Sequence, residues 1–502
     1  MRWSRSVVMV ACLIGGGRTF LNQPVGRRRM PRVMFATQQG RASAAVKQQQ
    51  EMGKVAQSEK LEVVPPRGTR DFYPEEMRVR TWLFGEWRAA AARHGFEEYD
   101  SPILESEALY TRKAGEEVTQ QLYNFEDKGG RRVSLRPEMT PSLARMVMAR
   151  RNGLPMPLKW FSIPQCWRFE KPSRGRRREH YQWNMDIWGV EGVTAEAELL
   201  AAVVGFFEAV GLTSEDVGIK VNSREVLAEV LRSVAGVDAD EEPARFAATC
   251  VLVDKLDKLP PSALYDDFAQ ASGMSSDDVD ALVDALDSST FDDLPVGSRA
   301  RRDLTELFDL ADAYKIADWL VFDAKIVRGL AYYTGIVFEG FDRSGKLRAI
   351  CGGGRYDQLL ATFGGEALPA VGFGFGDAVV MELLEMKGLV PQTVDAVDVL
   401  AFPFAADDPD LSADLGRAAA TVAATLRRHN LNVDLVLQGK KPKAAFKQAD
   451  RRRAALVVMV APEEWQNGDL VVKDMALGTQ ATVPLDDLAD YVIRARADPP
   501  KG

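Results

Sequence analysis

Apolar residues recur at helical spacing in one part of this chain and at strand spacing in others. The helical series, with one apolar residue every four positions, is Val79, Leu83, Trp87 and Ala91. Gly95 follows where a helix commonly ends, so we predict a helix over residues 74–94 and a strand over residues 96–99. Residues 133–189 and 320–376 alternate short apolar runs with basic or glycine-rich turns, which is typical of antiparallel strands of one sheet.

Two further segments have patterns of their own. Residues 224–318 separate the two strand-rich segments and are acidic, rich in alanine and leucine, and poor in aromatic residues, which predicts a helical insertion. After Pro391 strand-like and helix-like runs alternate, and this predicts a small α/β domain. Its strand-like runs are residues 397–402, 432–437 and 455–460, and its helix-like run is residues 411–429.

Composition adds a leader to this organisation. The chain has 502 residues, 46% of them apolar and 27% charged, which is enough for two or three folded domains. No uninterrupted apolar run reaches about 18 residues, so we expect no membrane-spanning segment and no membrane partner. Residues 1–50 hold eight arginines and one lysine but no acidic residue, although the whole chain has a net charge of −8. This predicts an organelle-targeting leader, removed or disordered, that directs the protein to the chloroplast, the mitochondrion or both.

The predicted fold class is therefore α+β: an antiparallel sheet flanked by helices, with a helical insertion and a C-terminal α/β domain. The expected segments are a leader (1–60), a core in two parts (61–223 and 319–390), the insertion (224–318) and the last domain (391–502).

Several kinds of chemistry find no support in the residues. The four cysteines stand far apart and there are only three histidines, so neither a metal site built by the protein alone nor a Ser-His-Asp triad is expected. Residues 340–346 satisfy the glycine and lysine positions of a P-loop, but Leu347 follows instead of Ser or Thr. Strand-like runs flank this segment, which predicts a hairpin turn.

The charged residues of the first strand-rich segment form a more specific pattern. Residues 135–140, 166–172 and 182–189 combine an arginine with carboxylates and amides. Arg168 on a strand could hold a carboxylate and a phosphate together, because a planar guanidinium donates two parallel hydrogen bonds. The alternative for Arg168 is an ion pair with Glu170 or Asp186 on the same sheet.

These blocks resemble motif 2 of the class II aminoacyl-tRNA synthetases, and their details resemble the histidine-specific subgroup. Residues 327–335 and 351–357 resemble the two motifs particular to that subgroup, and residues 95–102 resemble motif 1, whose proline lies at a dimer interface. The similarity extends over about residues 64–493. It implies the antiparallel catalytic sheet of class II synthetases, an anticodon-binding last domain and a homodimer.

The resemblance implies an organellar ligase that activates L-histidine with ATP and transfers it to tRNA(His). The histidine-binding residues that it implies are Glu138, Met139, Thr140, Gln182, Asp186, Tyr332 and Tyr333. Among these, Asp186 and Tyr333 would address the imidazole, which has one donor and one acceptor nitrogen.

The same resemblance implies roles for the cations. Arg168 and Arg328 would stabilise the negative charge that develops when the histidine carboxylate attacks the α-phosphorus of ATP. Arg168, Glu170 and Arg178 would contact ATP, and Mg²⁺ would bind mainly through phosphate oxygens. The expected tRNA-binding residues are Arg174 and Arg176 in the motif 2 loop and Lys440 and Lys441 in the last domain.

Two positions depart from the family pattern. Val379 stands where motif 3 normally has an ATP-binding arginine, and Ala331 stands where an acidic residue is frequent. Arg178 or a second magnesium ion is expected to hold the terminal phosphates instead. Two alternatives stay open: a catalytically silent relative, either a regulatory subunit of ATP phosphoribosyltransferase or a histidine-sensing protein, and a class II synthetase for another amino acid.

Overall fold

The computed structural model describes residues 62–112, 119–239, 241–256, 259–290, 294–327, 332–393 and 396–497. The predicted leader, Arg328 and Ala331 lie outside the described residues.

A nine-stranded sheet forms the centre of the catalytic segment, in the order β1-β5-β7-β12-β11-β10-β8-β9 with β6 paired to β7. Its strands are β1 (Glu97–Glu98), β5 (Leu158–Ser162), β6 (Gln165–Trp167), β7 (Glu179–Trp188), β8 (Val217–Ser223), β9 (Leu320–Phe322), β10 (Ile336–Asp342), β11 (Cys351–Arg355) and β12 (Ala370–Gly376). The predicted antiparallel sheet is confirmed for all its inner strands. Only the edge pairs β1–β5 and β8–β9 are parallel. The P-loop-like segment lies between the antiparallel strands β10 and β11, as the hairpin prediction requires.

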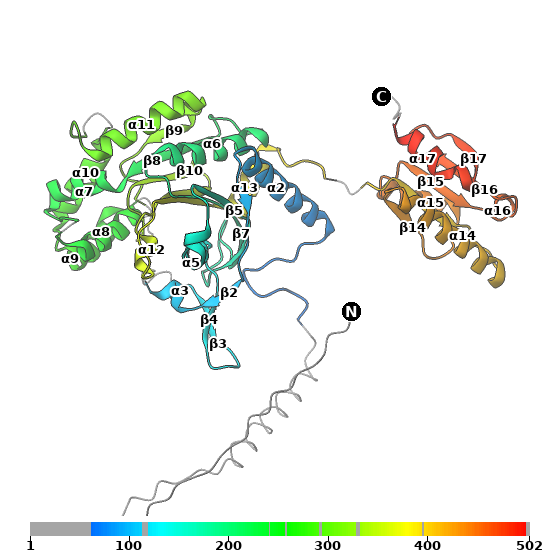
Figure 1. Ribbon diagram of the computed structural model, residues 1–502, viewed down its shortest axis with the longest axis horizontal. Coiled ribbons are helices and arrows are strands. Elements are labelled where there is room, and N and C mark those ends of the chain that lie inside the picture. The colour runs from blue at the N-terminus through cyan, green and yellow to red at the C-terminus, as the bar shows by residue number, and fades with distance from the viewer. Residues whose placement is uncertain are drawn as a thin grey trace, which may run out of the picture. The chain divides into compact units, whose positions relative to one another are not determined.

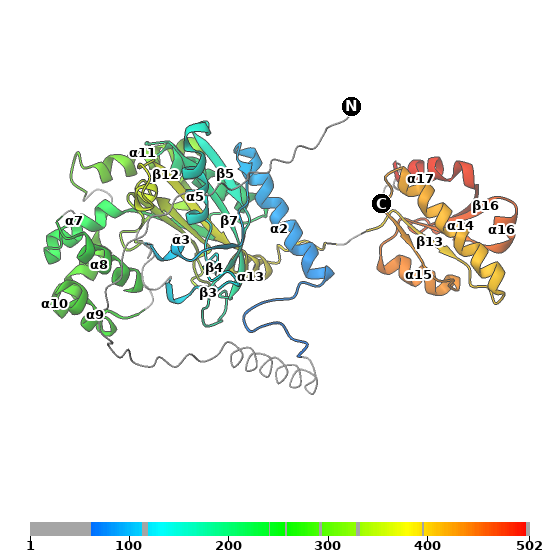
Figure 2. The same cartoon turned by 60° about the horizontal axis from the view of Figure 1, so that its bottom comes forward.

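Helices cover both faces of this sheet (Figures 1 and 2). The helices α2 (Pro74–Arg93), α6 (Thr194–Ala209) and α13 (Asp377–Lys387) bury their apolar residues against one face. The helices α5 (Thr140–Arg150) and α12 (Leu359–Thr362) cover part of the other face. The predicted helix over residues 74–94 is thus α2, and Gly95 after it has a left-handed φ of +71°.

A small antiparallel sheet and a group of helices complete the segment. The sheet has the order β2-β4-β3, and α3 (Ala108–Thr111) follows its first strand. Its strands are β2 (Leu104–Ser106), β3 (Tyr123–Glu126) and β4 (Arg132–Leu135). The helical insertion is confirmed and consists of α7 (Arg224–Ala235), α8 (Pro243–Leu256), α9 (Tyr265–Ser272), α10 (Ser276–Ser288) and α11 (Arg299–Tyr314). Buried residues of the insertion belong to the same apolar cluster as the sheet.

The last domain is the predicted α/β unit. Its five-stranded sheet has the order β14-β13-β15-β16-β17, and its first three strands are parallel. The strands are β13 (Val399–Pro403), β14 (Val433–Leu435), β15 (Leu456–Val460), β16 (Asp469–Asp474) and β17 (Gln480–Pro484). The helices are α14 (Pro409–Arg428), α15 (Pro442–Arg451), α16 (Pro462–Gln466) and α17 (Leu488–Ala497). This domain has its own apolar clusters on both faces of its sheet. Within the described part of the chain, no helix has the length and apolar character needed to cross a membrane.

A buried ion pair ties α6 to the end of β11. Arg355 donates from Nε and Nη2 to the two carboxylate oxygens of Glu196 at 2.7 and 2.6 Å, and both side chains are almost fully buried. Arg355 also donates to the backbone carbonyls of Val190 and Gly192. These contacts satisfy a guanidinium that would otherwise lie desolvated in the core.

We predict that Glu196→Ala lowers the free energy of unfolding of the catalytic segment by about 3–5 kcal/mol, because it removes the two-point partner of the buried Arg355 and leaves only the longer contact with Asp357, at 3.3 Å. Urea unfolding followed by tryptophan fluorescence measures this loss. The matched control is Glu98→Ala, which removes the partly exposed pair with Arg88 and should cost under about 1 kcal/mol. Equal losses for both variants would contradict the proposed importance of the buried pair.

Candidate active site

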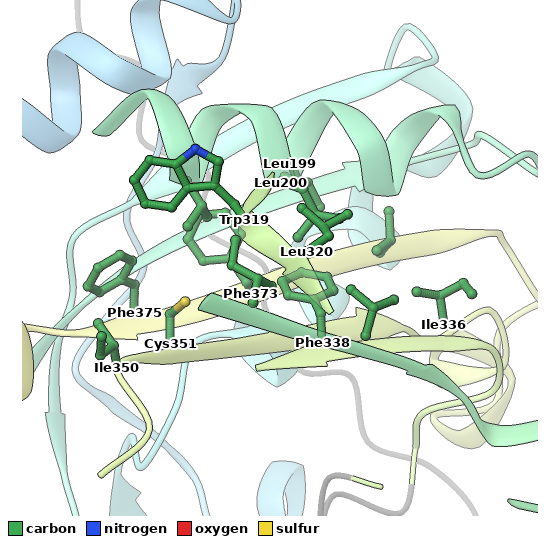
Figure 3. Close-up of a cluster of buried hydrophobic side chains, with 14 of the residues drawn as sticks. Leu199, Leu200, Trp319, Leu320, Ile336, Phe338, Ile350, Cys351, Phe373 and Phe375 are labelled. Carbon is green, nitrogen blue, oxygen red and sulfur yellow. The ribbon is translucent and has the colours of Figure 1, made fainter. Parts of the chain in front are cut away.

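Between Gln182 and Asp186, the polar side chains of β7 in the centre of the sheet lie on one face. Along β7, Trp183, Met185 and Ile187 point into the apolar cluster that Figure 3 shows in part. The residues between them, Gln182, Asn184 and Asp186, point to the opposite face, because neighbouring side chains of a strand alternate.

Glycines of β12 keep that opposite face open. Gly372, Gly374 and Gly376 pair with Asp186, Asn184 and Gln182. A Cβ atom on Gly372 would lie 2.2 Å from Asp186 Oδ1, and one on Gly374 would lie 3.5 Å from Asn184 Oδ1. Since any larger residue at 372 would collide with the carboxylate, the glycine strand forms a floor beside the polar row of β7.

Asp186 is buried beside these glycines, and only one of its two carboxylate oxygens accepts a hydrogen bond within the described structure. The Tyr356 hydroxyl donates to Asp186 Oδ1. Asp186 Oδ2 is buried and has no hydrogen-bond partner among the described residues. Burial raises the pKa of Asp186 to about 7; the Tyr356 hydrogen bond opposes this shift and the nearby Glu138 adds to it. The free oxygen can accept a hydrogen bond from a ligand N–H.

A second carboxylate lies nearby, at the start of α5. The Tyr332 hydroxyl donates to Glu138 Oε2 at 2.9 Å, and Thr140 is the first residue of the helix. Burial raises the pKa of Glu138, while Arg168 and the Tyr332 hydrogen bond lower it. The Tyr332 ring contacts those of Tyr333 and Tyr356 at centroid distances of 5.0 and 5.8 Å. The aromatic group thus connects the two carboxylates.

Arg168 lies one residue beyond β6 instead of on the predicted strand. Its Nε donates to the backbone carbonyl of Pro137 at 3.0 Å, and its charge acts on Glu138. No ion pair joins Arg168 to Glu170 or Asp186 in the described structure; Glu170 instead pairs with Arg176 at 2.5 Å. The guanidinium of Arg168 therefore lies among the candidate site residues and is not neutralised by an ion pair within the sheet.

The basic motif 2 loop is folded against α13. Arg174 forms an ion pair with Glu382 of that helix. A Cβ atom on Gly175 would lie 3.2 Å from Cγ2 of Val379, so the loop packs on the position that carries no cation. The guanidinium of Arg178 stacks over the Phe169 ring at 4.1 Å, and its Nε donates to the carbonyl of Glu170 at 3.0 Å.

The remaining predicted residues have varied surroundings. Met139 is fully buried, and its sulfur lies 3.6 Å from Ser101 Oγ and from Arg136 Nη1. Lys440 donates to Gln448 Oε1 at 2.5 Å, and Lys441 precedes the first residue of α15. The structure thus brings together the polar residues of β7, the start of α5, the two tyrosines and Arg168. It describes Lys440 and Lys441 only within the last domain.

Sequence reasoning assigned no role to Tyr356 or Arg70. Tyr356 stands in a quoted histidine-type block, so that block already contained the signal. Arg70 forms ion pairs with Glu179 at 3.3 Å and with Asp377 at 2.9 Å. These partners are distant in the sequence, so spacing alone could not identify Arg70.

The predicted resemblance is supported by comparison with known proteins. The family model described as histidyl-tRNA synthetase matches residues 68–377, and the model described as anticodon binding domain matches residues 399–495. The chloroplastic/mitochondrial histidine–tRNA ligase of Arabidopsis thaliana is 51% identical over 433 residues, which cover 86% of each chain. The histidine–tRNA ligase of Haloarcula marismortui is 38% identical and is matched over 84% of this chain and 95% of its own length.

Solved structures agree with the fold. The histidyl-tRNA synthetase from Nostoc sp. PCC 7120 has a TM-score of 0.65 at 23% identity, over 87% of this chain and 100% of its own. The apo enzyme of S. aureus has a TM-score of 0.58. The fold class and the enzyme class, an aminoacyl-tRNA ligase, are confirmed, and the alternative of a silent relative is not supported. With its catalytic and anticodon-binding segments both matched, the chain belongs to the histidyl-tRNA synthetase family.

Proposed function

We propose that this chain activates L-histidine with ATP in the pocket around Asp186 and transfers it to tRNA(His). The observation that supports this most directly is the buried Asp186 oxygen without a partner, beside the glycine floor. An imidazole N–H would satisfy it, and an apolar side chain of similar size would not. Because Tyr356 already donates to the other oxygen, the carboxylate is held in place for its ligand.

The other residues of the pocket bind the remaining groups of histidine and the α-phosphate of ATP. Glu138, Thr140 and Gln182 receive the histidine ammonium in this proposal, since all three offer acceptor oxygens and Glu138 also supplies a negative charge. Arg168 stabilises the charge that develops at the α-phosphate as the histidine carboxylate attacks and pyrophosphate departs. Arg328 carries a corresponding role, as its place in the histidine-type block implies. Tyr333, with Asp186, addresses the imidazole, and Met139 and Tyr332 line the same pocket.

The metal ion of the proposed reaction is the Mg²⁺ that is bound to ATP. Among the described residues, no group of three His, Cys, Asp or Glu side chains could hold a metal ion. We propose that Mg²⁺ binds mainly through the phosphate oxygens of ATP, where it neutralises phosphate charge. Burial, followed by the charges of Arg168 and Arg70, lowers the pKa of His180 to about 3, so its imidazole is neutral near pH 7.

The proposal extends to partners and location. Lys440 and Lys441, with Arg174 and Arg176, provide cations for the tRNA backbone. The protein acts as a homodimer in the chloroplast, the mitochondrion or both. The acid-free composition of residues 1–50 and the similarity to a chloroplastic/mitochondrial ligase support this location.

We predict that the chain from residue 61 catalyses histidine-dependent exchange of pyrophosphate into ATP, and that no other natural amino acid replaces histidine. The reason is the hydrogen-bonding pattern of the Asp186 pocket. A panel of amino acids in the exchange assay measures this selectivity. Equal exchange with a different amino acid would reject the histidine assignment.

We predict that Asp186→Asn raises KM for histidine roughly 10- to 100-fold, the effect of losing a charged hydrogen bond. With a pKa of about 7, the wild-type carboxylate ionises as pH rises from 6 to 8, so kcat/KM for histidine should rise over this range. The variant should lose this part of the rise. Ionisation of free histidine affects both proteins equally, so the difference between their profiles isolates Asp186.

The control for that experiment is Asp342→Asn, which changes another buried carboxylate, at the end of β10. Its pH profile should match the wild type. A rise that persists unchanged in Asp186→Asn would show that another group titrates.

We predict that a chain ending at Pro391 keeps histidine-dependent exchange but loses most tRNA charging. The candidate pocket residues all precede this point, and the last domain has separate apolar clusters. Both assays are run on the same folded truncation, with the chain from residue 61 as reference. Charging at the full rate would remove the anticodon-binding role of the last domain.

A further inference from the structure

The proposed nucleotide site lacks a cation on α13. Val379 is buried, belongs to the main apolar cluster and packs against Gly175 of the motif 2 loop. Its neighbours Asp377 and Ala378 supply no positive charge, and Asp377 is already paired with Arg70. Any cation for the far end of ATP must therefore come from another element.

The strand next to β12 leads to such a cation. β11 and β12 are antiparallel, with Cys351 opposite Phe375. Figure 3 shows Ile350 and Cys351 beside Phe375 at one end of the apolar cluster. β11 begins at Cys351, and β12 ends at Gly376 directly before α13, so Arg348 precedes β11 at the end of the sheet where α13 begins. Arg348 thus reaches, from the β10–β11 connection, the same end of the sheet that α13 leaves without a cation.

The motif 2 residues meet Arg348 at this end. Arg348 lies close enough to Arg176 and Glu170 for both charges to act on it. Glu170 is already engaged by Arg176 at 2.5 Å. The exposed guanidinium of Arg348 has no ion-pair partner among the residues that the structure describes. Desolvation and the charge of Arg176 lower its pKa, which Glu170 only partly offsets.

The local charge is unbalanced in a way that suits a polyphosphate. Arg176 pairs with the Glu170 carboxylate, Arg178 donates to the Glu170 backbone carbonyl, and the charge of Glu170 also acts on Arg348. Three arginines thus lie around a single carboxylate-bearing residue. Arg178 is stacked on Phe169 and Arg176 pairs with Glu170, whereas Arg348 has neither an ion pair nor a ring contact among the described residues. A guanidinium donates in pairs to phosphate oxygens, and a bound polyanion would relieve the repulsion between the arginines.

We propose that Arg348 binds the terminal phosphates of ATP and supplies the positive charge that position 379 does not. This inference rests on the proposed ATP-dependent activation of histidine. It makes Arg348 a substrate-binding residue of that reaction, contributed by a strand connection instead of by the helix after β12.

The test measures binding of ATP and of AMP to the full chain by calorimetry, without tRNA. Arg348→Ala should weaken ATP binding at least about tenfold while AMP binding stays within about twofold, because AMP lacks the terminal phosphates. Arg348→Lys should recover part of the loss, since it keeps the charge without the fork. Lys346→Ala removes an exposed cation from the same connection and should change neither affinity.

The outcomes separate the possible errors. Unchanged ATP affinity in Arg348→Ala, or equal losses for ATP and AMP, would overturn the inference. A loss of tRNA charging with normal ATP binding would assign Arg348 to the tRNA and also overturn it. If Arg348→Ala does not fold, the comparison of Arg348→Lys with Lys346→Ala decides. A wild-type protein without histidine-dependent exchange would reject the proposed function, while the ATP–AMP comparison would still judge Arg348.

Discussion

The pairing of β7 with β12 is the constraint on which both the core and the site depend. Their antiparallel register sets Asp186 opposite Gly372 and Trp183 opposite Phe375. Because side chains alternate along each strand, one register assigns the aromatic residues to the helix-covered face and the polar residues to the open face. A shift by one residue would turn the polar row toward the apolar cluster and the aromatic row toward the pocket.

The aromatic face supplies the rigidity that the open face needs. Trp87 of α2, Trp183 of β7 and Phe375 of β12 lie in mutual ring contact at centroid distances near 6 Å. Close packing of this kind fixes the backbone of both strands. The glycines on the other side could not do so, since they present no side chains to pack.

Several buried charges outside the candidate site have ion-pair partners, whereas the buried carboxylate of Asp186 in the site has none among the described residues. Glu196 and Arg355 satisfy each other, and Arg70 holds Glu179 and Asp377. Asp186 has only one partner for its two oxygens, and its raised pKa records the cost of that arrangement. A buried charge whose partners compensate its desolvation is compatible with a stable fold, whereas a buried charge that is only partly compensated can be satisfied by a ligand.

Much of the fold could be predicted from local pattern, because amphipathic spacing and turn residues act over a few neighbours. The helix ending at Gly95, the helical insertion and the α/β order of the last domain are of this kind. The parallel edge pair of β1 with β5 was not predicted, since it joins segments about sixty residues apart. The leader, Arg328 and the roles of individual site residues stay predictions.

By itself the sequence determined the family and the set of residues available for chemistry, because the motif blocks are contiguous and keep their residue types. Tertiary structure decided which of those residues meet. It set Tyr356 against Asp186, engaged Arg176 with Glu170, buried Val379 under the motif 2 loop and left Arg348 beside that loop without a partner among the described residues. These relations join strands and loops that are distant in the chain, and a carboxylate or guanidinium becomes a binding group only through the partners and the desolvation that folding gives it.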